Sequence, residues 1–502
     1  MSRIALLIAV LVTACVPPTP ITITPTPERQ RGALRWWVDS MVGAPEFRNA
    51  HWGILIVDPE RGDTIMAHNA AKLFMPASNM KIITGAVALA QLGPDYQFRT
   101  TLLAGGPVVD SVLRGDLIVV GTGDPSVSDA MRGDAMLALL EIADTMAARG
   151  ITRIEGRLRA EGDAFPGAIY GYGWSWDEVD EPYSAGVDEL YFNEGFSRIV
   201  IRGGAFPGEA VTASVLPSRG YPRVRIDART VAPPDTMISG DALIIPLSIQ
   251  VERDSAPGSV VVRGTIAPHD SQVVRFAHQA PPKAYLTALQ EALEARGLAV
   301  AGNDTVQPGA TVTMMDTIAV ILSPPLREIL PAFEKPSQNQ IGEILLRTLG
   351  RERSGRGTPD SGRAVIQRQL LEWGATKEGF VVRAGSGLSR YNYLSPETIV
   401  RVLDVMRRDT VFPVFFGALP VAGIDGTLAN RMKGTMAEAN ARAKTGFVAQ
   451  ARSLSGYVTS ADGRLLIYSL LCNNWTVPVR VVERMQDMIV ARLAGMTIGA
   501  RR

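Results

Sequence analysis

The sequence has little cysteine, histidine and lysine. Its 502 residues include 2 Cys, 4 His and seven Lys, although Lys and Arg together number 51. Cys15 follows the apolar N-terminal run and Cys472 lies in an apolar stretch, so we expect no intramolecular disulfide and a buried structural thiol at Cys472. There is no His-Glu-x-x-His motif and no Cys/His cluster, and no histidine stands in a catalytic-triad signature. We therefore predict no metal ion and no cofactor.

The sequence also lacks a charge imbalance. Its formal net charge at pH 7 is +1 and no run of Lys or Arg occurs, so nucleic acid is not an expected partner. Apolar residues make up 46% and charged residues 20% of the chain, as in a folded globular protein. A chain of 502 residues exceeds what one hydrophobic core usually serves, so we expect two or three domains.

The N-terminal segment has the pattern of an export signal. Arg3 precedes an apolar run, and small residues follow up to Cys15. Residues 1–15 are too short to span a bilayer as a helix, and we interpret them as a signal peptide. Their ending resembles the bacterial lipoprotein signal, in which the cysteine is lipidated; a plain secretory signal with a coincidental cysteine is the alternative. Residues 16–28, rich in Pro and Thr, predict an extended linker, so we expect a periplasmic protein held at the membrane by a lipid on Cys15.

Strand and helix patterns near both ends of the chain predict one α+β domain. Two strands near the N-terminus and three near the C-terminus suggest a single antiparallel sheet flanked by helices. The expected strands are Gly53–Val57, Thr64–His68, Ala441–Phe447, Ser453–Thr459 and Arg464–Cys472. The expected helices are Leu34–Met41, Asn79–Leu92, Ile341–Leu349, Ala364–Glu372, Pro396–Met406 and Val479–Leu493.

The middle of the chain has a different pattern. It mixes short strands and Gly/Pro turns with two helical segments, Ala130–Ala148 and Ala284–Ala295. We therefore assign residues 29–98 and 323–502 to the main domain, and residues 99–322 to inserted β-rich domains.

Three short motifs carry the predicted chemistry. A serine and a lysine three positions apart at a helix start lie on one face, so Lys81 can accept the proton of the Ser78 hydroxyl if its own pKa is depressed. Burial or a second positive charge, such as Lys444, would depress it. The motifs are Ser78-Asn79-Met80-Lys81, Ser337-Gln338-Asn339 and Lys444-Thr445-Gly446.

The other motif residues complete an acyl-transfer site. The backbone N–H groups of Ser78 and Phe447 can hold a developing oxyanion, and Gly446 leaves room for substrate beside the strand. The Lys444 ammonium and the Thr445 hydroxyl can bind a substrate carboxylate.

The middle motif has two further tasks. Ser337 can relay a proton to the leaving amine. Asn339 can bind a substrate carbonyl or orient Lys81, and the sequence leaves both roles open. Structural alternatives exist: Ser78 as a helix cap, Lys81 as a solvated residue and Lys444 as an edge-strand charge. The helix around Lys81 is apolar nearly all round, which disfavours a solvated lysine.

The order of these motifs resembles that of the penicillin-recognising serine enzymes. Further segments resemble one branch, the class C low-molecular-mass penicillin-binding proteins, which are D-alanyl-D-alanine carboxypeptidase/endopeptidases. These segments are Gly115-Asp116-Leu117, Gly123-Asp124-Pro125-Ser126, Gly173-Trp174-Ser175-Trp176-Asp177 with Tyr183, Lys335-Pro336 with Glu343, and Gly385-Ser386-Gly387-Leu388-Ser389-Arg390. The chain departs from the family at Ala384, where Asp is usual, and at Glu194, where Asn is common.

The resemblance implies a fold, a reaction and partners. The fold is a β-lactamase/transpeptidase-like domain, with a five-stranded sheet and a helical subdomain. In the implied reaction, peptidoglycan stem peptides or β-lactams acylate Ser78, and water then releases the acyl group. A β-lactamase is one alternative, but it often uses a Glu-x-x-Leu-Asn loop, and no Leu-Asn occurs here. A catalytically inactive cell-wall-binding protein is the other, and the intact motifs disfavour it. Carboxypeptidase and endopeptidase activity both stay open.

Overall fold

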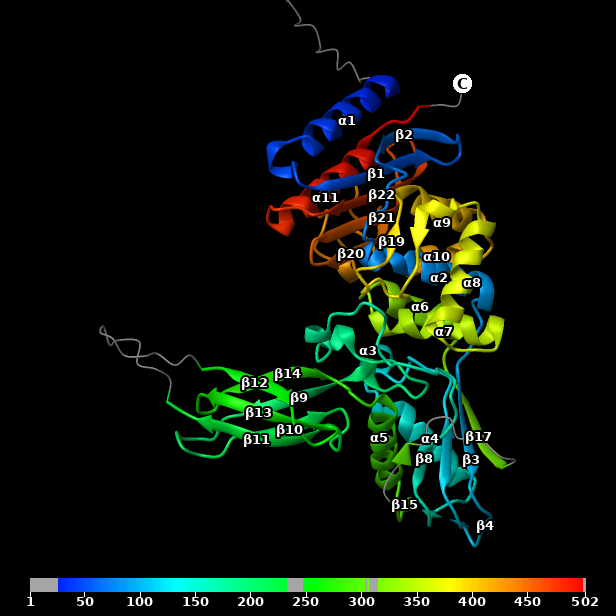
Figure 1. The fold of residues 1–502 in the computed structure, drawn as a ribbon, viewed down its shortest axis with the longest axis vertical. Helices are drawn as coiled ribbons and strands as arrows, with labels where there is room; N and C mark the ends of the chain where they lie inside the picture. Colours follow the sequence, from blue (N-terminus) through cyan, green and yellow to red (C-terminus); the bar gives the residue numbers. More distant parts are fainter. Residues whose placement is uncertain (1–25, 233–246, 303–304, 307–314, 500–502) are drawn as a thin grey trace, which may run out of the picture.

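The computed structural model describes residues 26–232, 247–302, 305–306 and 315–499. The predicted signal peptide, Cys15 and the linker up to residue 25 lie outside these residues. The described part is elongated, with a sheet and its helices at one end, smaller sheets at the other, and a β-rich arm projecting sideways (Figure 1). Within the described ranges, no helix has the length and apolar character needed to cross a membrane.

A five-stranded antiparallel sheet joins the two ends of the chain. Its strand order is β2-β1-β22-β21-β20, so the N-terminal hairpin pairs with the last strand of the C-terminal meander. The predicted antiparallel sheet is thereby confirmed, and the strand with the Lys-Thr-Gly motif lies at its edge. The strands are β1 (His51–Asp58), β2 (Asp63–His68), β20 (Arg442–Val448), β21 (Ala451–Thr459) and β22 (Leu465–Asn473).

Helices cover both faces of this sheet, because its strands alternate apolar side chains between two cores. Leu34 and Val38 of α1 (Pro27–Val42) pack with α11 (Val479–Gly495) and side chains such as Ile54 on one face. Leu55, the next residue along β1, faces the opposite core with the remaining helices. These are α2 (Met80–Leu92), α6 (Leu326–Glu334), α7 (Asn339–Ser354), α8 (Pro359–Glu372), α9 (Pro396–Arg408) and α10 (Phe412–Ala418).

Helix α2 is the central helix of that second core. Its residues Met80 to Leu89 are all buried, because apolar or small side chains occur on every side of the helix. Helices α6, α7, α8 and α9 all contact it. A buried central helix holds its N-terminal end in a fixed place, and that end carries the first motif.

The segment between β3 and β17 forms smaller sheets. A five-stranded sheet, β16-β8-β6-β3-β17, packs with α4 (Met136–Ala148) and α5 (Pro281–Ala295) around a separate core, next to a four-stranded sheet, β15-β7-β5-β4. The strands are β3 (Arg99–Ala104), β4 (Val108–Val109), β5 (Val112–Leu113), β6 (Leu117–Val120), β7 (Arg153–Ile154), β8 (Leu158–Ala160), β15 (Ala299–Val300), β16 (Thr305–Val306) and β17 (Asp316–Leu322).

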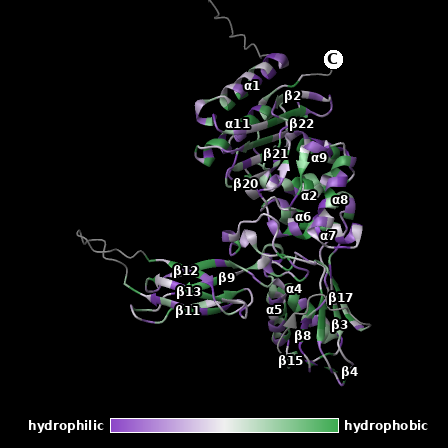
Figure 2. Cartoon of the chain, in the orientation of Figure 1, coloured by the Kyte–Doolittle hydropathy of each residue, from purple (hydrophilic) through white to green (hydrophobic). Residues whose placement is uncertain are grey.

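The arm in Figure 1 consists of two three-stranded sheets that share a small apolar core. Figure 2 shows hydrophobic residues running along several of its strands. Its strands are β9 (Phe196–Arg202), β10 (Thr212–Leu216), β11 (Arg223–Thr230), β12 (Ile249–Arg253), β13 (Ser259–Ile266) and β14 (Ser271–Ala277). The arm and the neighbouring sheets agree with the predicted β-rich character of the middle segment.

Several expected helices are longer or divided in the structure, α7 and α8 among them, and two of these differences have a clear local cause. Helix α1 begins at Pro27, inside the predicted linker, because the Thr26 side chain accepts a hydrogen bond from Arg29 N at 3.4 Å and proline is favourable at a first helical position. The segment expected as one helix over Ala130–Ala148 is two, α3 (Asp129–Arg132) and α4. Gly133 separates them because it adopts φ +78°, a left-handed conformation that ends a helix.

Candidate active site

Ser78 lies in a short 3-10 turn that leads directly into α2. The turn spans Ala77–Asn79, and the sheet holds it in place because Ser453 Oγ donates a hydrogen bond to Pro76 O at 2.7 Å. Ala77 has φ +46°, an unfavourable conformation for a residue with a side chain. The close approach of Gly387 leaves the turn little space, since a Cβ at that glycine would lie 1.9 Å from Ala77 O. The turn before Ser78 is therefore held in a constrained shape.

Lys81 is fully buried and lies beside Ser78, one helical turn away. Its Nζ is 2.9 Å from Ser78 Oγ, 2.7 Å from Asn339 Oδ1 and 2.7 Å from the carbonyl oxygen of Ser386. Two of the three neighbours can only accept, so they take two N–H groups of Lys81. A neutral amine has two N–H groups and one lone pair, so in that form Lys81 would direct its lone pair to the Ser78 hydroxyl, whereas an ammonium would donate to Ser78 Oγ.

The surroundings of Lys81 favour the neutral amine. Burial holds the pKa of Lys81 well below its ordinary value, and the positive charge of Lys444 lowers it further. Glu334 and Glu343 act in the opposite direction. Burial is the larger effect, so the structure supplies the depressed pKa that proton acceptance requires.

Asn339 is the first residue of α7 and connects Lys81 to the middle segment of the chain. Its Oδ1 accepts from Lys81, while its Nδ2 donates to Tyr183 O at 2.9 Å. Ser337, two residues earlier, has φ +65° and lines the same cavity as Ser78. The second motif therefore lies at the N-terminal end of α7, where Asn339 also contacts the middle segment.

The Lys-Thr-Gly strand β20 lies directly against the Ser78 turn. Asn79 Nδ2 donates to Lys444 O at 2.8 Å, and a Cβ at Gly446 would lie 2.9 Å from Ser78 N. Ala443 N donates to Pro420 O, away from β21. Residues two apart on a strand direct their backbone groups to the same side, so Phe447 N–H also points off the free edge.

The Lys444 and Thr445 side chains occupy different places. Lys444 is fully buried, and its Nζ donates to Thr445 O at 3.2 Å. Burial lowers the pKa of Lys444 to about 8, against the opposing effect of Glu334. The Thr445 hydroxyl donates to Thr427 Oγ1 at 2.7 Å, and both threonines line the cavity.

A cavity of about 590 Å³ opens beside Ser78. Of the predicted site residues, it is lined by Ser78, Ser337, Asn339, Thr445 and Phe447. Lys81, Lys444 and Gly446 are close to these residues but do not line the cavity. The structure therefore brings all three motifs together, with both lysines behind the cavity wall.

Sequence reasoning missed several residues of this region. Arg452 lines the cavity and stands opposite Phe447 in the β20–β21 ladder, with its guanidinium 5.5 Å from the phenyl ring centre. An ion pair at 2.5 Å joins it to Glu483, yet burial lowers its pKa to about 10. Glu334 is a buried charged residue on the apolar face of α6, and an acidic residue at such a position of the sequence indicates a candidate site residue. Thr427 lies outside the three motifs, and nothing in the sequence around it indicates a role in the site.

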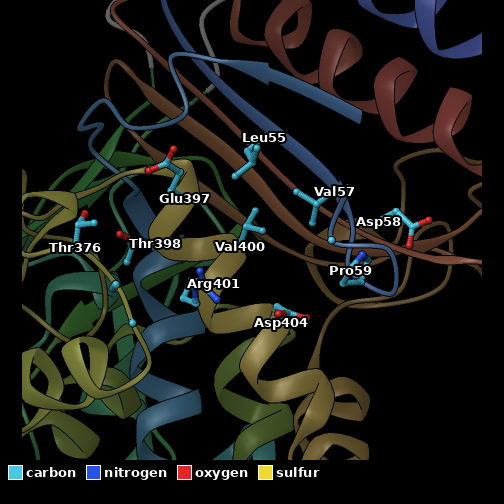
Figure 3. Close-up of a pocket in the computed structure, with 13 residues that line it drawn as sticks. Leu55, Val57, Asp58, Pro59, Thr376, Glu397, Thr398, Val400, Arg401 and Asp404 are labelled. Atoms are coloured by element: carbon cyan, nitrogen blue, oxygen red, sulfur yellow. The ribbon is translucent and has the colours of Figure 1, made fainter. Parts of the chain in front are cut away.

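A second cavity, of about 380 Å³, lies between the β1–β2 hairpin and α9 (Figure 3). None of the motif residues lines it, and its buried carboxylate, Asp58, already accepts from Arg464 Nε at 2.8 Å. Among the described residues, no group of His, Cys, Asp and Glu side chains is arranged to hold a metal ion. The Ser78 cavity is therefore the candidate active site.

A serine just before a buried central helix, next to an edge strand with a Lys-Thr-Gly motif, is typical of the penicillin-binding serine peptidases. The chain belongs to the D-Ala-D-Ala carboxypeptidase 3 (S13) family, which matches residues 34–495. This match confirms the predicted family and the enzyme class, a serine-type D-alanyl-D-alanine carboxypeptidase. The five-stranded antiparallel sheet with helices on both faces confirms the predicted fold class.

Individual relatives agree with this assignment. The D-alanyl-D-alanine carboxypeptidase of Actinomadura sp. (strain R39) is 32% identical over 477 residues, which cover 92% of this chain and 84% of that protein. The D-alanyl-D-alanine carboxypeptidase DacB of Haemophilus influenzae is 26% identical over 448 residues, covering 86% of this chain and 87% of that one. The crystal structure of penicillin binding protein 4 from H. influenzae has the same fold, with a TM-score of 0.72 at 23% identity and coverage of 91% and 94%.

Proposed function

We propose that Ser78 is the nucleophile of this peptidase and that Lys81, as a neutral amine, accepts its proton. The observation that carries the proposal is the set of three contacts at Lys81 Nζ. Asn339 Oδ1 and Ser386 O take its N–H groups, which directs the lone pair to Ser78 Oγ at 2.9 Å. These contacts favour the orienting role for Asn339 over direct binding of substrate.

The proposed acylation follows from this arrangement. The Ser78 proton moves to Lys81 while Oγ attacks the carbonyl carbon of the penultimate D-Ala. The backbone N–H groups of Ser78 and Phe447 bind the oxyanion, and Ser337 passes the proton to the departing amine. Terminal D-Ala leaves, and an ester joins the shortened peptide to Ser78. A water molecule, with the same amine as base, then hydrolyses the ester.

The cavity can recognise the substrate's terminal carboxylate. Thr445 offers a hydroxyl and Arg452 a guanidinium at the cavity surface, while the buried Lys444 adds positive charge from behind. Arg452 was not among the predicted residues, and we propose that it shares the role first assigned to Lys444 and Thr445. This combination suits a peptide that ends in a free carboxylate.

The proposed substrates are peptidoglycan stem peptides, and β-lactams should acylate the same serine. The H. influenzae penicillin binding protein 4, which shares this fold, has also been solved with a β-lactam. We further propose that residues 29–98 and 323–502 form the catalytic domain and that residues 99–322 are inserted domains.

Location is a separate proposal. We propose an exported, periplasmic protein anchored through a lipid on Cys15. Cell fractionation tests the anchor: wild-type protein should sediment with membranes, whereas the Cys15→Ala variant should not. Equal sedimentation of both would contradict lipidation.

Digestion of purified muropeptides tests the proposed reaction. Wild-type protein should remove the terminal D-Ala from pentapeptide stems, as seen by mass spectrometry, and cross-linked muropeptides separate endopeptidase from carboxypeptidase activity. Ser78→Ala should release no D-Ala. Ser40→Ala, which changes an exposed serine on α1, is the matched control and should retain full activity. Release of D-Ala by Ser78→Ala would overturn the proposal.

A further inference from the structure

A buried carboxylate without a hydrogen-bond partner lies behind the candidate active site. Glu334, the last residue of α6, is fully buried, and neither of its carboxylate oxygens has a hydrogen-bond partner within the described part of the chain. It lies against α2, since a Cβ at Gly85 would be 2.8 Å from Glu334 Oε1. Gly85 is one helical turn beyond Lys81. Buried carboxylates are normally hydrogen-bonded, so this one requires an explanation.

Two lysines are its charged neighbours. The buried side chains of Lys81 and Lys444, when charged, both act on the Glu334 carboxyl, one from α2 and the other from β20. Burial raises the pKa of Glu334 to about 7, and both lysines oppose that rise. Their charges thus favour the ionised carboxylate.

The other charged groups near the lysines have partners of their own. Glu343 on α7 accepts a hydrogen bond from Ser386 N at 2.9 Å, and its charge acts on Arg347 and Arg363. Arg452 on β21, which acts on Lys444, is ion-paired with Glu483. Glu343 also raises the pKa of Lys81, but its carboxylate already has these partners. In the part of the chain that the structure describes, Glu334 is therefore the carboxylate without a hydrogen-bond partner that acts on both lysines.

One carboxylate can balance one ammonium. Burying an ion without a counter-charge is costly, so a group of two lysines and one carboxylate is most stable with one ammonium, one carboxylate and one neutral amine. The environment decides which lysine is neutral. Lys81 has two fixed acceptors and an adjacent hydroxyl, and Lys444 has its strongest attraction to Glu334.

We propose that Glu334 is a positioning residue whose negative charge keeps Lys444 as the ammonium, so that Lys81 is the lysine left uncharged beside Ser78. This inference rests on the proposed roles of Ser78 and Lys81. Glu334 acts through the lysines and touches no substrate. Without the negative charge of Glu334, Lys444 loses its proton at lower pH. The site then lacks the buried positive charge of Lys444, which also lowers the pKa of Lys81.

The pH dependence of acylation tests this role. The second-order rate constant for labelling by a fluorescent penicillin is measured from about pH 5 to about pH 10 in wild-type and Glu334→Gln protein. Wild type should lose rate as pH rises through about 8, where Lys444 deprotonates. In Glu334→Gln the pH at which the labelling rate constant falls, the alkaline limb of the profile, should be lower by about one unit. At higher pH the variant should then be labelled about tenfold more slowly than wild type. A change confined to stability would leave the limb in place.

Two further variants keep the test decisive. Glu189→Gln changes another buried acid, whose charge acts on Arg347 and is not among the charges that act on Lys81 or Lys444, and its profile should match wild type. Gly85→Ala keeps Glu334 but would place a Cβ 2.8 Å from its Oε1, so the carboxylate has to shift relative to Lys444 and the alkaline limb should move, which provides a test even if Glu334→Gln does not fold. An unmoved limb in folded Glu334→Gln or in Gly85→Ala overturns the inference while Ser78 labelling still supports the proposed function. Labelling that persists in Ser78→Ala overturns the proposed function itself.

Discussion

At the scale of single residues, the chemistry depends on one amine. Lys81 could be predicted as the proton acceptor because Ser78 and Lys81 share one face of a helix that is apolar on every side. The acceptor that completes its surroundings, the Ser386 carbonyl, could not be predicted, because it comes from a loop 305 residues away in the sequence. Backbone groups of distant loops leave no trace in local sequence pattern.

The protonation of Lys81 sets the acid limb of activity. Burial and the charge of Lys444 hold the pKa of Lys81 well below the ordinary lysine value, so the amine becomes protonated, and unable to accept the Ser78 proton, as pH falls through that lowered pKa. We expect the acylation rate to be constant around pH 7 and to fall in acid. Stopped-flow labelling with a fluorescent penicillin measures this profile. A rate that is negligible at pH 7 and rises only near the ordinary lysine pKa would contradict a depressed pKa.

Lys81→Arg provides the matching substitution. It keeps a basic side chain of similar length, but the guanidinium stays protonated and cannot accept a proton near neutral pH, so acylation should fall by about 100-fold to 10,000-fold. Lys433→Arg, which changes an exposed lysine that does not line the cavity, is the control and should keep the wild-type rate.

At the scale of elements, the contact between β20 and the Ser78 turn decides whether the motifs meet. The strands and helices that carry the motifs could be predicted from apolar periodicity, and their bounds agree to within a few residues. Two of the helix bounds that differ depend on caps and turns, at Thr26 and Gly133, where a single side chain or a left-handed glycine outweighs periodicity.

Gly446 makes the close approach of β20 possible. A Cβ at this position would lie 2.2 Å from Ser453 Oγ, 2.7 Å from Pro76 O and 2.9 Å from Ser78 N. Gly446→Ala should therefore push the strand away from the nucleophile and lower acylation by about 100-fold, the size expected when one oxyanion donor is lost. Rate constants from penicillin labelling measure the effect.

A substitution at another tightly packed glycine is the control that separates a loss of acylation rate from a loss of stability. A Cβ at Gly121, in the middle segment, would lie 2.1 Å from Glu189 O. Gly121→Ala should lower the melting temperature but leave the acylation rate of the folded protein unchanged. Equal losses of rate in the two variants would show that the Gly446 contact has no special role.

At the scale of the whole molecule, the arrangement of domains could be predicted from the sequence only in outline. The order of motifs predicted a sheet built from both ends of the chain with a β-rich segment between them. The arm formed by β9 to β14 could not be predicted, because its strands pair across long sequence separations, and one pair is parallel. Likewise, the burial of Lys444 behind the cavity wall depends on packing between separate parts of the chain.

Core packing is expected to hold the whole molecule together without disulfides. Cys472 is fully buried in β22, and burial raises the pKa of its thiol, so the native protein should not react with a bulky thiol reagent. In a Cys15→Ala background, labelling should appear only with global unfolding by guanidinium, as followed by circular dichroism. Complete labelling well below the unfolding transition would contradict a buried thiol.

The central claim is that Ser78 forms the covalent acyl-enzyme, and the position of the acyl group tests it most directly. Wild-type protein is acylated with a fluorescent penicillin at neutral pH, digested, and analysed by tandem mass spectrometry. We predict one label per chain, on Ser78, and none in the Ser78→Ala variant. A label on another residue of the cavity, such as Ser337, or a label that survives in Ser78→Ala, would contradict the account.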